Sequence, residues 1–403
     1  MARALEGVRV VEVAQWWFVP SGGAVLADWG ADVIKIEHPV TGDPQRGLVT
    51  SGYFPPTGGV NFMMEQSNRG KRSVGLDLAN PRGREVLYRL CKDADVFLTN
   101  FLPAARRKLE IDVEHIRKVN PNIIYARGHG HGARGPDVEK GGYDAASFWS
   151  RGGIAHALTR ADAAAPTMQR AAFGDSAGGM TTAGGIAAAL FRRARTGEPS
   201  IVDVSLLGTA MWILAPDIVL ARFTDQEMPV FDRAQAPNPI VNSYKTKDGR
   251  WLFLNMLQPD RFWADLCRHI DRPDMIADPR FENGMARFQN REACVRELEK
   301  TFASRTLDEW RRKLDDVEGV WAPMQSAKEV GQDVQVVANG YLSEVDVGDG
   351  TKFTLVASPV QFDETTPTLR PGPDMGQHTE EVLLALGYSW EDLASLKEAG
   401  AIS

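Results

Sequence analysis

The chain has 403 residues, of which 43% are hydrophobic and 25% charged, and its formal net charge at pH 7 is −7. A chain of this length exceeds the usual size of one domain, and its composition is that of a folded globular protein and not of a disordered one. The acidic balance argues against a nucleic-acid partner, which would require a basic face.

The first third of the chain alternates short runs of β-branched residues with helical segments. This pattern predicts helices over 21–29, 81–93 and 104–119, and strands over 8–13, 31–37, 73–78, 95–99 and 122–126. Strands that alternate with helices form βαβ units, in which helices cover both faces of a parallel sheet. Ligands of such sheets bind beyond the carboxyl ends of the strands.

The second half of the chain has a different pattern. A Gly- and Ala-rich segment ends in a predicted helix over 177–195, and the Pro-rich sequence FDRAQAPNP at 231–239 predicts a linker. Residues 244–255 predict a hairpin around Lys-Asp-Gly. Beyond it the sequence predicts helices over 260–269, 291–303 and 306–314, a β-rich piece over 343–360, and a terminal helix from Thr379.

A GxGxxG string follows the predicted strand at 122–126, with glycines at 130, 132 and 135. A dinucleotide site would need a helix to begin there, but Pro136 and the charged run DVEK follow instead. The acidic residue that binds a ribose about 20 residues further on is also missing. We therefore interpret these glycines as residues that let the chain turn sharply at a strand end.

The residues that usually bind metal show no suitable grouping. His129 and His131 lie two residues apart, without a further cluster of possible ligands nearby, which favours polar residues at the rim of a site over a metal or base role. Cys91, Cys267 and Cys294 are far apart and form no CxxC pair, so we expect neither a zinc site nor disulfides.

The N-terminal segment does not have the pattern of a signal peptide. Glu6 and Glu12 interrupt what would have to be its apolar core, and no stretch approaches the ~18 apolar residues of a membrane span. We therefore expect no membrane partner and a cytoplasmic location.

The segment FGDSAGG at 173–179 holds the strongest candidate for chemistry. An acidic residue in a Gly-flanked turn before a helix is ordinarily an N-cap. The glycines around Asp175 would also leave its carboxylate open to close approach, which capping does not require. Amide groups at the helix start would keep that carboxylate ionised, as a nucleophile must be.

Several sequence blocks together identify a family. They occur in family order between residues 5 and about 388, and include LADWGADVIKIEHPVTGDPQR, NRGKRSVGLDLANP, ADVFLTNF, GHGARGP, GGYDAAS, GDSAGG and GQHTEEVLLALGY. The chain resembles the family III CoA-transferases, which include formyl-CoA and carnitine CoA-transferases and the related α-methylacyl-CoA racemases.

The resemblance implies a covalent mechanism. Asp175 would attack an acyl-CoA thioester, an aspartyl-CoA thioester would form, and a carboxylic acid acceptor would then take the CoA. Gly178 and Gly179, in the expected turn, would offer backbone N–H groups to the tetrahedral oxyanions. Coenzyme A enters as part of the substrate, and no permanently bound cofactor or metal is implied.

The CoA contacts are also implied by the resemblance. His38 and Lys108 stand where relatives often have arginine, so neither offers a bidentate fork to a phosphate. The other implied contacts are Trp17 and Phe18, Leu76, Asp77 and Leu78, Asn100 and Phe101, and Tyr143. Aromatic residues, namely Trp16, Trp17, Phe18, Phe54 and Trp149, suggest a partly aromatic pocket and a sizeable acyl chain.

Two other functions stay open. In the racemases the segment matching GGYDAAS carries a histidine that moves the α-proton, and here that position is Tyr143, followed by Asp144. A phenol is a weaker base than an imidazole at neutral pH, which favours transfer over racemisation. The second alternative is a CoA-binding protein without turnover, suggested by the weakened basic contacts at His38 and Lys108.

The resulting fold prediction is α/β, with an open, parallel, Rossmann-like sheet in the large domain. The resemblance implies a small α+β domain inserted into the chain and an interlocked homodimer. The predicted domains are 1–229, the large CoA-binding domain, 230–323, the small domain, and 324–403, a C-terminal segment that returns to the large domain.

Overall fold

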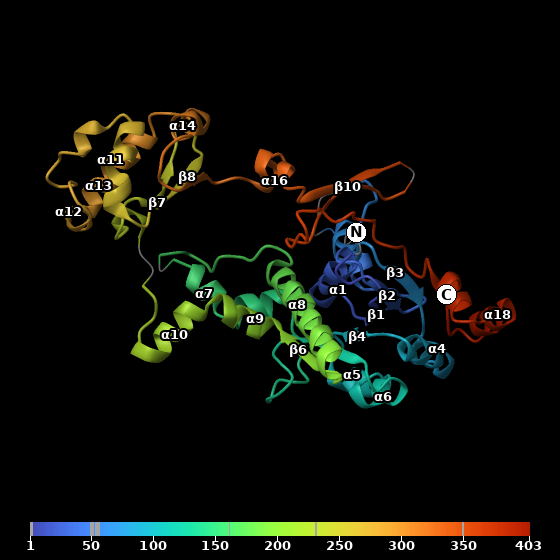
Figure 1. Cartoon of the computed structure of the whole chain (residues 1–403). Helices are drawn as coiled ribbons and strands as arrows, with labels where there is room; N and C mark the ends of the chain where they lie inside the picture. Colours follow the sequence, from blue (N-terminus) through green and yellow to red (C-terminus); the bar gives the residue numbers. More distant parts are fainter. Residues whose placement is uncertain (1–2, 49–51, 53–56, 161, 230–231, 349) are drawn as a thin grey trace. The chain divides into compact units, whose positions relative to one another are not determined.

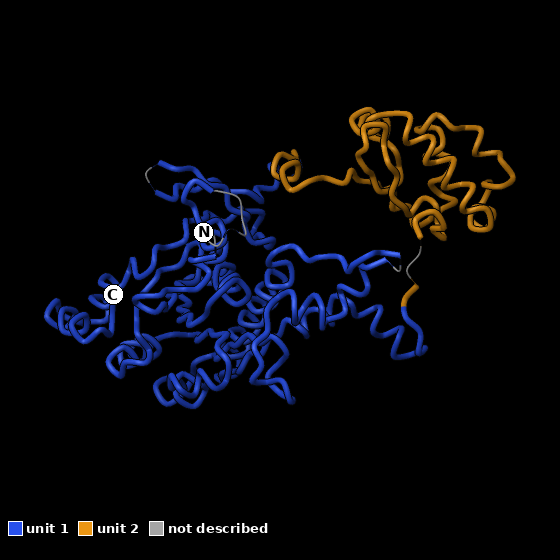
Figure 2. The backbone as a smooth tube through the Cα atoms, turned by 180° about the vertical axis from the view of Figure 1, so that it is seen from behind, with its two compact units in different colours: residues 1–227, 335–403 blue, residues 228–334 orange. Residues whose placement is uncertain are grey.

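The computed structural model describes residues 3–48, 52, 57–160, 162–229, 232–348 and 350–403. The chain divides into two compact units, and the first combines Met1–Glu227 with Gln335–Ser403 (Figure 2). The second unit is Met228–Val334, which extends beyond the expected domain end at 323. The expected boundary at residue 230 and the start of the expected linker lie outside the described residues.

The first unit is built on a six-stranded sheet in which all neighbouring strands are parallel, in the order β3-β2-β1-β4-β5-β6. The strands are β1 (Arg9–Val13), β2 (Asp32–Glu37), β3 (Arg72–Gly75), β4 (Val96–Thr99), β5 (Ile124–His129) and β6 (Ile201–Ser205). The strand order reverses between β1 and β4, and a crevice opens at such a switch point. The parallel sheet predicted from the sequence is confirmed.

Alternate residues of the strands face two separate apolar cores. Val10 faces a core that contains residues of α1 (Phe18–Asp28) and α8 (Phe173–Thr196), whereas Val11 faces a core that contains α4 (Pro81–Lys92). The second core also contains Leu383 and Leu396 from the C-terminal helices α17 (Thr379–Ala385) and α18 (Trp390–Glu398). The end of the chain therefore packs against the sheet formed by its beginning (Figure 1).

The helices differ from the prediction at three places. Helix α1 begins at Phe18 and not at Ser21, whose Oγ donates to the carbonyl oxygen of Phe18 at 2.8 Å inside the helix. Helix α8 begins at Phe173 and not at 177. The predicted helix over 104–119 is two helices, α5 (Pro103–Lys108) and α6 (Val113–Val119), because Glu110 between them has a φ of 54°.

The remaining elements of the first unit connect this framework. They are α2 (Gln45–Leu48), α3 (Phe62–Asn68), the π-helical turn η2 (Asp144–Ser150), α7 (Ile154–Leu158), α9 (Leu206–Ile213), α10 (Ala215–Thr224) and the antiparallel pair β10 (Leu342–Asp346) and β11 (Lys352–Val356). Helix α16 (Val334–Ala338) lies at the junction of the two units in the sequence.

The second unit has its own apolar core, around Trp310 and Phe302. Its antiparallel sheet contains β7 (Val241–Lys245), β8 (Trp251–Asn255) and β9 (Trp321–Pro323), and the hairpin over 244–255 is present as predicted. Its helices are η3 (Arg233–Gln235), α11 (Pro259–His269), η4 (Pro273–Met275), α12 (Gly284–Gln289), α13 (Arg291–Phe302), α14 (Leu307–Lys313) and α15 (Ala327–Val330).

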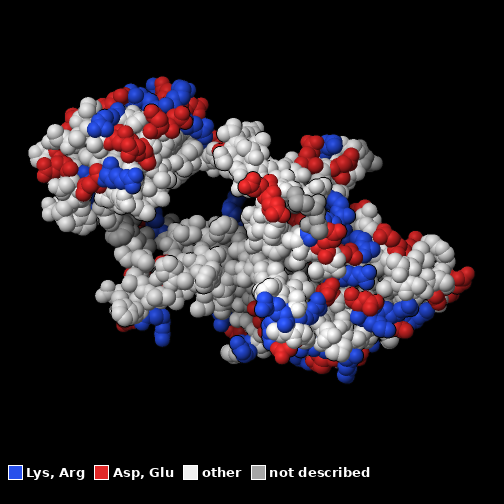
Figure 3. Space-filling model, in the orientation of Figure 1, with Lys and Arg blue, Asp and Glu red and all other residues white. Residues whose placement is uncertain are grey.

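Charge is distributed unevenly on the face shown in Figure 3, where the surface of α9 and α10 is largely free of charged side chains. Large apolar side chains are exposed there, including Met211, Trp212, Ile213, Val219 and Phe223. Within the described part of the chain, no single helix is long and apolar enough to cross a membrane, and α9 with α10 meets that test only as a sharply bent pair.

Candidate active site

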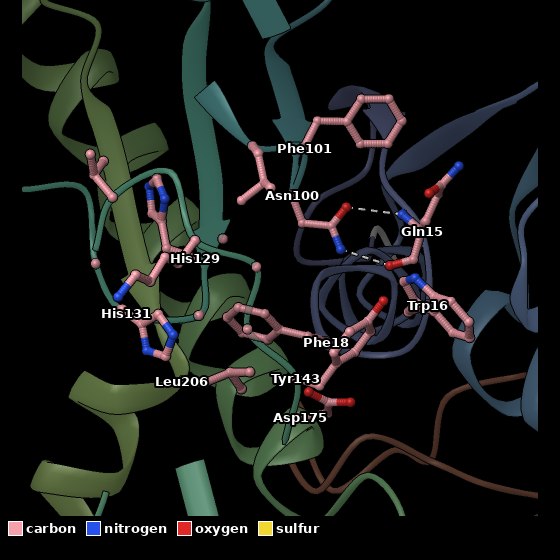
Figure 4. Close-up of a pocket in the computed structure, with 18 of the residues that line it drawn as sticks. Gln15, Trp16, Phe18, Asn100, Phe101, His129, His131, Tyr143, Asp175 and Leu206 are labelled. Carbon is pink, nitrogen blue, oxygen red and sulfur yellow. Dashed lines mark hydrogen bonds between the residues drawn. The ribbon is translucent and has the colours of Figure 1, made fainter. Parts of the chain in front are cut away.

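A cavity of about 450 Å³ opens at the carboxyl ends of β1, β4 and β5, beside the switch point of the sheet. Segments far apart in the sequence line it (Figure 4). Its main contributors are Gln15, Trp16 and Phe18 after β1, Asn100, Phe101 and Leu102 after β4, residues 128–132 of β5 and its loop, Lys140, Tyr143 and Asp175. Four residues of the sequence-predicted site, Phe18, Asn100, Phe101 and Tyr143, therefore lie around one cavity with Asp175.

Two loops of the cavity are joined by a reciprocal pair of hydrogen bonds. The backbone N–H of Gln15 donates to Asn100 Oδ1 at 3.0 Å, and Asn100 Nδ2 donates to the carbonyl oxygen of Gln15 at 2.7 Å (Figure 4). The carbonyl oxygen of Phe101 accepts from Arg106 Nη1 at 2.7 Å. These bonds hold the loops after β1 and β4 in fixed register at the switch point.

Trp16 has a backbone conformation that is unusual for a residue with a side chain. Its φ is 67°, and its N–H donates to Asp43 Oδ1 at 3.0 Å. The ring of Trp16 meets that of Tyr143 edge to face, with centroids 5.8 Å apart. Because 63% of Tyr143 is exposed, this aromatic pair forms an accessible wall of the cavity and not part of the core.

Asp175 lies in the first turn of α8, where a second carboxylate occupies the helix end. Both carboxylate oxygens of Asp144 accept from the N–H of Gly174, at 3.1 Å each, and Asp144 also accepts from the N–H of Asp175. A Cβ at position 174 would lie 2.2 Å from Cγ of Phe148 and 2.4 Å from Asp144 Oδ1. Glycine at 174 is therefore required for Asp144 to reach the start of α8.

The protonation of Asp175 differs from the expectation. The pKa of Asp175 is raised from 3.8 to about 8. Burial is the larger cause, and the charge of the nearby Asp144 carboxylate is the second. The pKa of Asp144 is also raised, by burial. The expectation that helix amides keep Asp175 ionised is wrong, because burial and the Asp144 carboxylate raise its pKa. The side chain of Asp175 remains only half-buried and faces the cavity.

Gly178 and Gly179 do not form a turn. Both lie inside α8, beyond its first turn, where backbone N–H groups bond within the helix. A Cβ at 178 would lie 2.4 Å from the Phe18 ring, and one at 179 would lie 1.9 Å from Ser21 Oγ. These glycines thus let α1 pack closely on α8, and their N–H groups are not directed at an oxyanion.

The remaining predicted CoA contacts lie away from the lining of this cavity. His38 is exposed, and its Nδ1 accepts from the N–H groups of residues 40 and 41, both at 3.2 Å. Leu76 is buried and pairs with Ile402, and Lys108 is exposed at the end of α5. Trp17, Asp77 and Leu78 also lie outside the lining of this cavity. Phe54, which was expected in an aromatic pocket, lies outside the described residues.

Sequence reasoning misplaced one group at the cavity, His129, and missed another, Lys140. His129 is not a rim residue: it is 8% exposed at the end of β5, and its Nε2 lies 3.2 Å from Asp203 Oδ1. Lys140 lines the cavity, with its ammonium 2.7 Å from Asp137, and its only signal was the charged run DVEK. Among the described side chains, no group of three His, Cys, Asp or Glu residues is arranged to hold a metal.

Comparison with known proteins identifies the family. The model of CoA-transferase family III matches residues 5–379. The chain belongs to CoA-transferase family III. It is 33% identical over 399 residues to (R)-2-hydroxy-4-methylpentanoate CoA-transferase of Clostridioides difficile, with 99% of each chain covered. It is 31% identical over 397 residues to cinnamoyl-CoA:phenyllactate CoA-transferase of Clostridium sporogenes, with 97% of this chain and 95% of the relative covered.

Solved structures agree with this family assignment. A CAIB/BAIF family protein from Brucella suis superposes with a TM-score of 0.83 at 28% identity, covering 96% of this chain and 100% of the other. Rv3272 from Mycobacterium tuberculosis gives a TM-score of 0.79 at 28% identity, with 94% and 99% covered. The chain is thus an enzyme of a family whose members transfer CoA between acyl-CoA thioesters and carboxylates, and the family predicted from the sequence is confirmed.

Proposed function

We propose that this enzyme moves CoA from an acyl-CoA to a carboxylic acid through an aspartyl-CoA thioester on Asp175. The observation that carries the proposal is the position of this carboxyl group. It is half-buried in a cavity at the switch point of the sheet, in a chain that matches CoA-transferase family III over residues 5–379. A carboxylate is the nucleophile that can accept CoA without losing the thioester energy to water.

The proposed steps balance as follows. The Asp175 carboxylate attacks the thioester carbonyl, the C–S bond breaks, and CoA departs as a thiolate. The acyl group and Asp175 are then joined in a mixed anhydride. The thiolate then attacks the aspartyl carbonyl and releases the donor acid as a carboxylate, which leaves aspartyl-CoA. The acceptor carboxylate attacks aspartyl-CoA to form a second anhydride and thiolate. Attack of the thiolate on the acceptor carbonyl yields the new acyl-CoA and regenerates Asp175.

The raised pKa of Asp175 sets a condition on the first step. With a pKa of about 8, most of this carboxyl group is protonated at neutral pH in the unliganded enzyme. Only the ionised fraction can attack, and a desolvated carboxylate is the more reactive for lacking a hydration shell. The rate of CoA transfer should therefore rise with pH up to about 8.

The substrates are proposed on the same basis. The pantetheine arm of CoA would lie in the cavity between Tyr143 and Phe101, with Lys140 placed to exchange Asp137 for a phosphate. The names of the two relatives contain 4-methylpentanoate, cinnamoyl and phenyllactate, which supports an apolar organic acid as the acceptor here.

A trapping experiment tests the covalent intermediate. Enzyme and acyl-CoA, mixed without an acceptor acid, should yield a protein adduct with the mass of CoA less one water. Hydroxylamine attacks thioesters, so it should release the CoA and leave a hydroxamate on Asp175. The Asp175→Ala variant should show neither product and lose several orders of magnitude in rate. An adduct on another residue, or a variant that retains a tenth of the activity, would refute the role of Asp175.

We also propose that the enzyme is a homodimer, as the family resemblance implies. The exposed apolar side chains of α9 and α10 support this, since a surface of that kind usually marks an interface. Light scattering of the wild-type protein should give the mass of a dimer, and replacing Trp212, which is 82% exposed, with aspartate should lower its Tm. A wild-type monomer would refute the proposal.

A further inference from the structure

A second cavity, of about 660 Å³, lies in the first unit beside the candidate active site. Helices α1, α3 and α8 and strand β11 with the residues that follow it form its walls. Most of its lining is apolar, with Val25, Phe62, Ala177, Met180, Phe353 and Val356 as the main contributors.

The charged and amide side chains of this lining are bonded to the protein itself. Arg69 makes an ion pair with Asp28 at 2.7 Å, and both side chains are buried. Gln66 donates to the carbonyl oxygen of Val356 at 2.8 Å and accepts from its N–H at 2.9 Å. Because these groups already have partners within the protein, the cavity suits an uncharged, apolar occupant.

The two cavities meet at a pair of neighbouring residues. Trp16 and Asp175 line the first cavity, and the residues that directly follow each of them, Trp17 and Ser176, line the second. Trp17 Nε1 donates to Ser176 Oγ at 3.0 Å, so this hydrogen bond marks the border between the cavities. A group that fills the apolar cavity therefore lies beside Ser176, the residue that follows Asp175 in α8.

We infer that the apolar cavity binds the hydrocarbon part of the acyl group, while CoA occupies the first cavity. This inference rests on the proposed function and names its substrate class. The class comprises thioesters and acids with an uncharged aliphatic or aryl chain of medium length, since cavities of a few hundred Å³ hold groups of that size. Trp17 lines the apolar cavity, so this predicted CoA contact belongs to the acyl side in our inference.

Filling the cavity tests the inference. Ala177→Leu adds bulk from α8, and Val356→Trp adds it from the opposite wall, at a residue distant in sequence from Asp175. Ala188→Leu is the matched control, because it makes the same change on an exposed position of the same helix. Titration calorimetry, with Asp175→Ala added to the wild type and to each variant so that no aspartyl-CoA forms, would measure the affinity of each protein for hexanoyl-CoA, acetyl-CoA and CoA.

The wild-type enzyme and Ala188→Leu should bind hexanoyl-CoA at least tenfold more tightly than acetyl-CoA, because each buried methylene contributes up to about fourfold. In both cavity variants, the ratio of the affinities for hexanoyl-CoA and acetyl-CoA should fall to near one. Their affinity for free CoA should equal that of the wild type. Equal affinities in the wild type, or a ratio unchanged in both cavity variants, would overturn the inference. If the ratios behave as expected but no acid accepts CoA, the proposed transfer fails and the cavity assignment stands.

Discussion

Replacing Asp175 with asparagine should stabilise the protein, and by more as the pH rises. Asparagine keeps the shape of the protonated carboxyl group but cannot ionise. In the folded wild-type protein, burial and Asp144 raise the pKa of Asp175 from 3.8 to about 8. The folded state therefore holds a proton that the unfolded state releases between pH 4 and 8. Stability falls with rising pH wherever the folded state binds more protons.

The size of the stability difference follows from the pKa shift of Asp175. One pKa unit corresponds to about 1.4 kcal/mol, so the full shift would give an upper bound of about 6 kcal/mol. Because the side chain of Asp175 reaches the cavity and can be partly solvated, we expect about half of that bound, roughly 3 kcal/mol, at pH 8. Near pH 4 the carboxyl group is largely neutral in the folded state, and the two proteins should have similar stability.

Thermal unfolding of both proteins at several pH values from 4.5 to 8.5 would measure this difference. Every other titrating group is common to the two proteins. The contributions of these groups to the pH dependence of Tm therefore largely cancel when the two Tm values are subtracted. The difference in Tm should rise to several degrees between the lowest and highest pH and level off above about 8, the folded pKa. A difference that does not change with pH, or a less stable asparagine variant at pH 8, would refute the reasoning.

Three further predictions concern the same unit. Asp144→Asn should move the rise of kcat/KM with pH to lower pH, since the Asp144 charge contributes to the raised pKa of Asp175; an unmoved profile would contradict this coupling. A 2-methylacyl-CoA in heavy water without an acceptor acid should gain no α-deuterium, because Tyr143 replaces the racemase histidine; rapid exchange would favour the racemase. The fragment 1–195 should show no cooperative melting by calorimetry, because it lacks Leu383 and the other C-terminal residues of one core; a cooperative transition would contradict this.

The parallel sheet was predictable because its signals are local. The β-branched runs at 8–13 and 31–37 became β1 and β2, and their alternate residues face two different cores. Motif order also identified the family, and hence Asp175 as the residue to examine. These features depend on residues close together in the sequence, where periodicity and spacing are informative.

The details of the site depend on contacts between distant segments. The sequence places Asp175 in a Gly-rich turn, whereas α8 begins before it, because Asp144 at the start of η2 caps the helix. Burial, together with the charge of Asp144, also reverses the expected ionisation of Asp175. Gly178 and Gly179 looked like turn residues, but their lack of side chains serves the packing of α1 on α8. Local sequence cannot distinguish a glycine needed for a turn from one needed for close helix packing.

The loop after β1 shows how a buried network can determine the geometry of this site. Lys35 Nζ donates to the carbonyl oxygen of residue 14 at 2.8 Å, and Lys71 Nζ donates to that of residue 20 at 2.8 Å. Glu12 and Asp43 balance these charges, with Lys35 2.9 Å from Asp43 and Lys71 2.8 Å from Glu12. All four side chains are fully buried, and burying charge in this way contributes little to stability on balance.

The contacts suggest a different reason for this network. Its charged groups bond the loop backbone at both ends, and Asp43 also accepts the N–H of Trp16, the residue with positive φ that faces Tyr143. A loop held at three points can keep Trp16 in one cavity and Trp17 in the next, although the two residues are consecutive. The charges buried between β1 and α1 therefore maintain the separation of the two cavities on either side of Asp175.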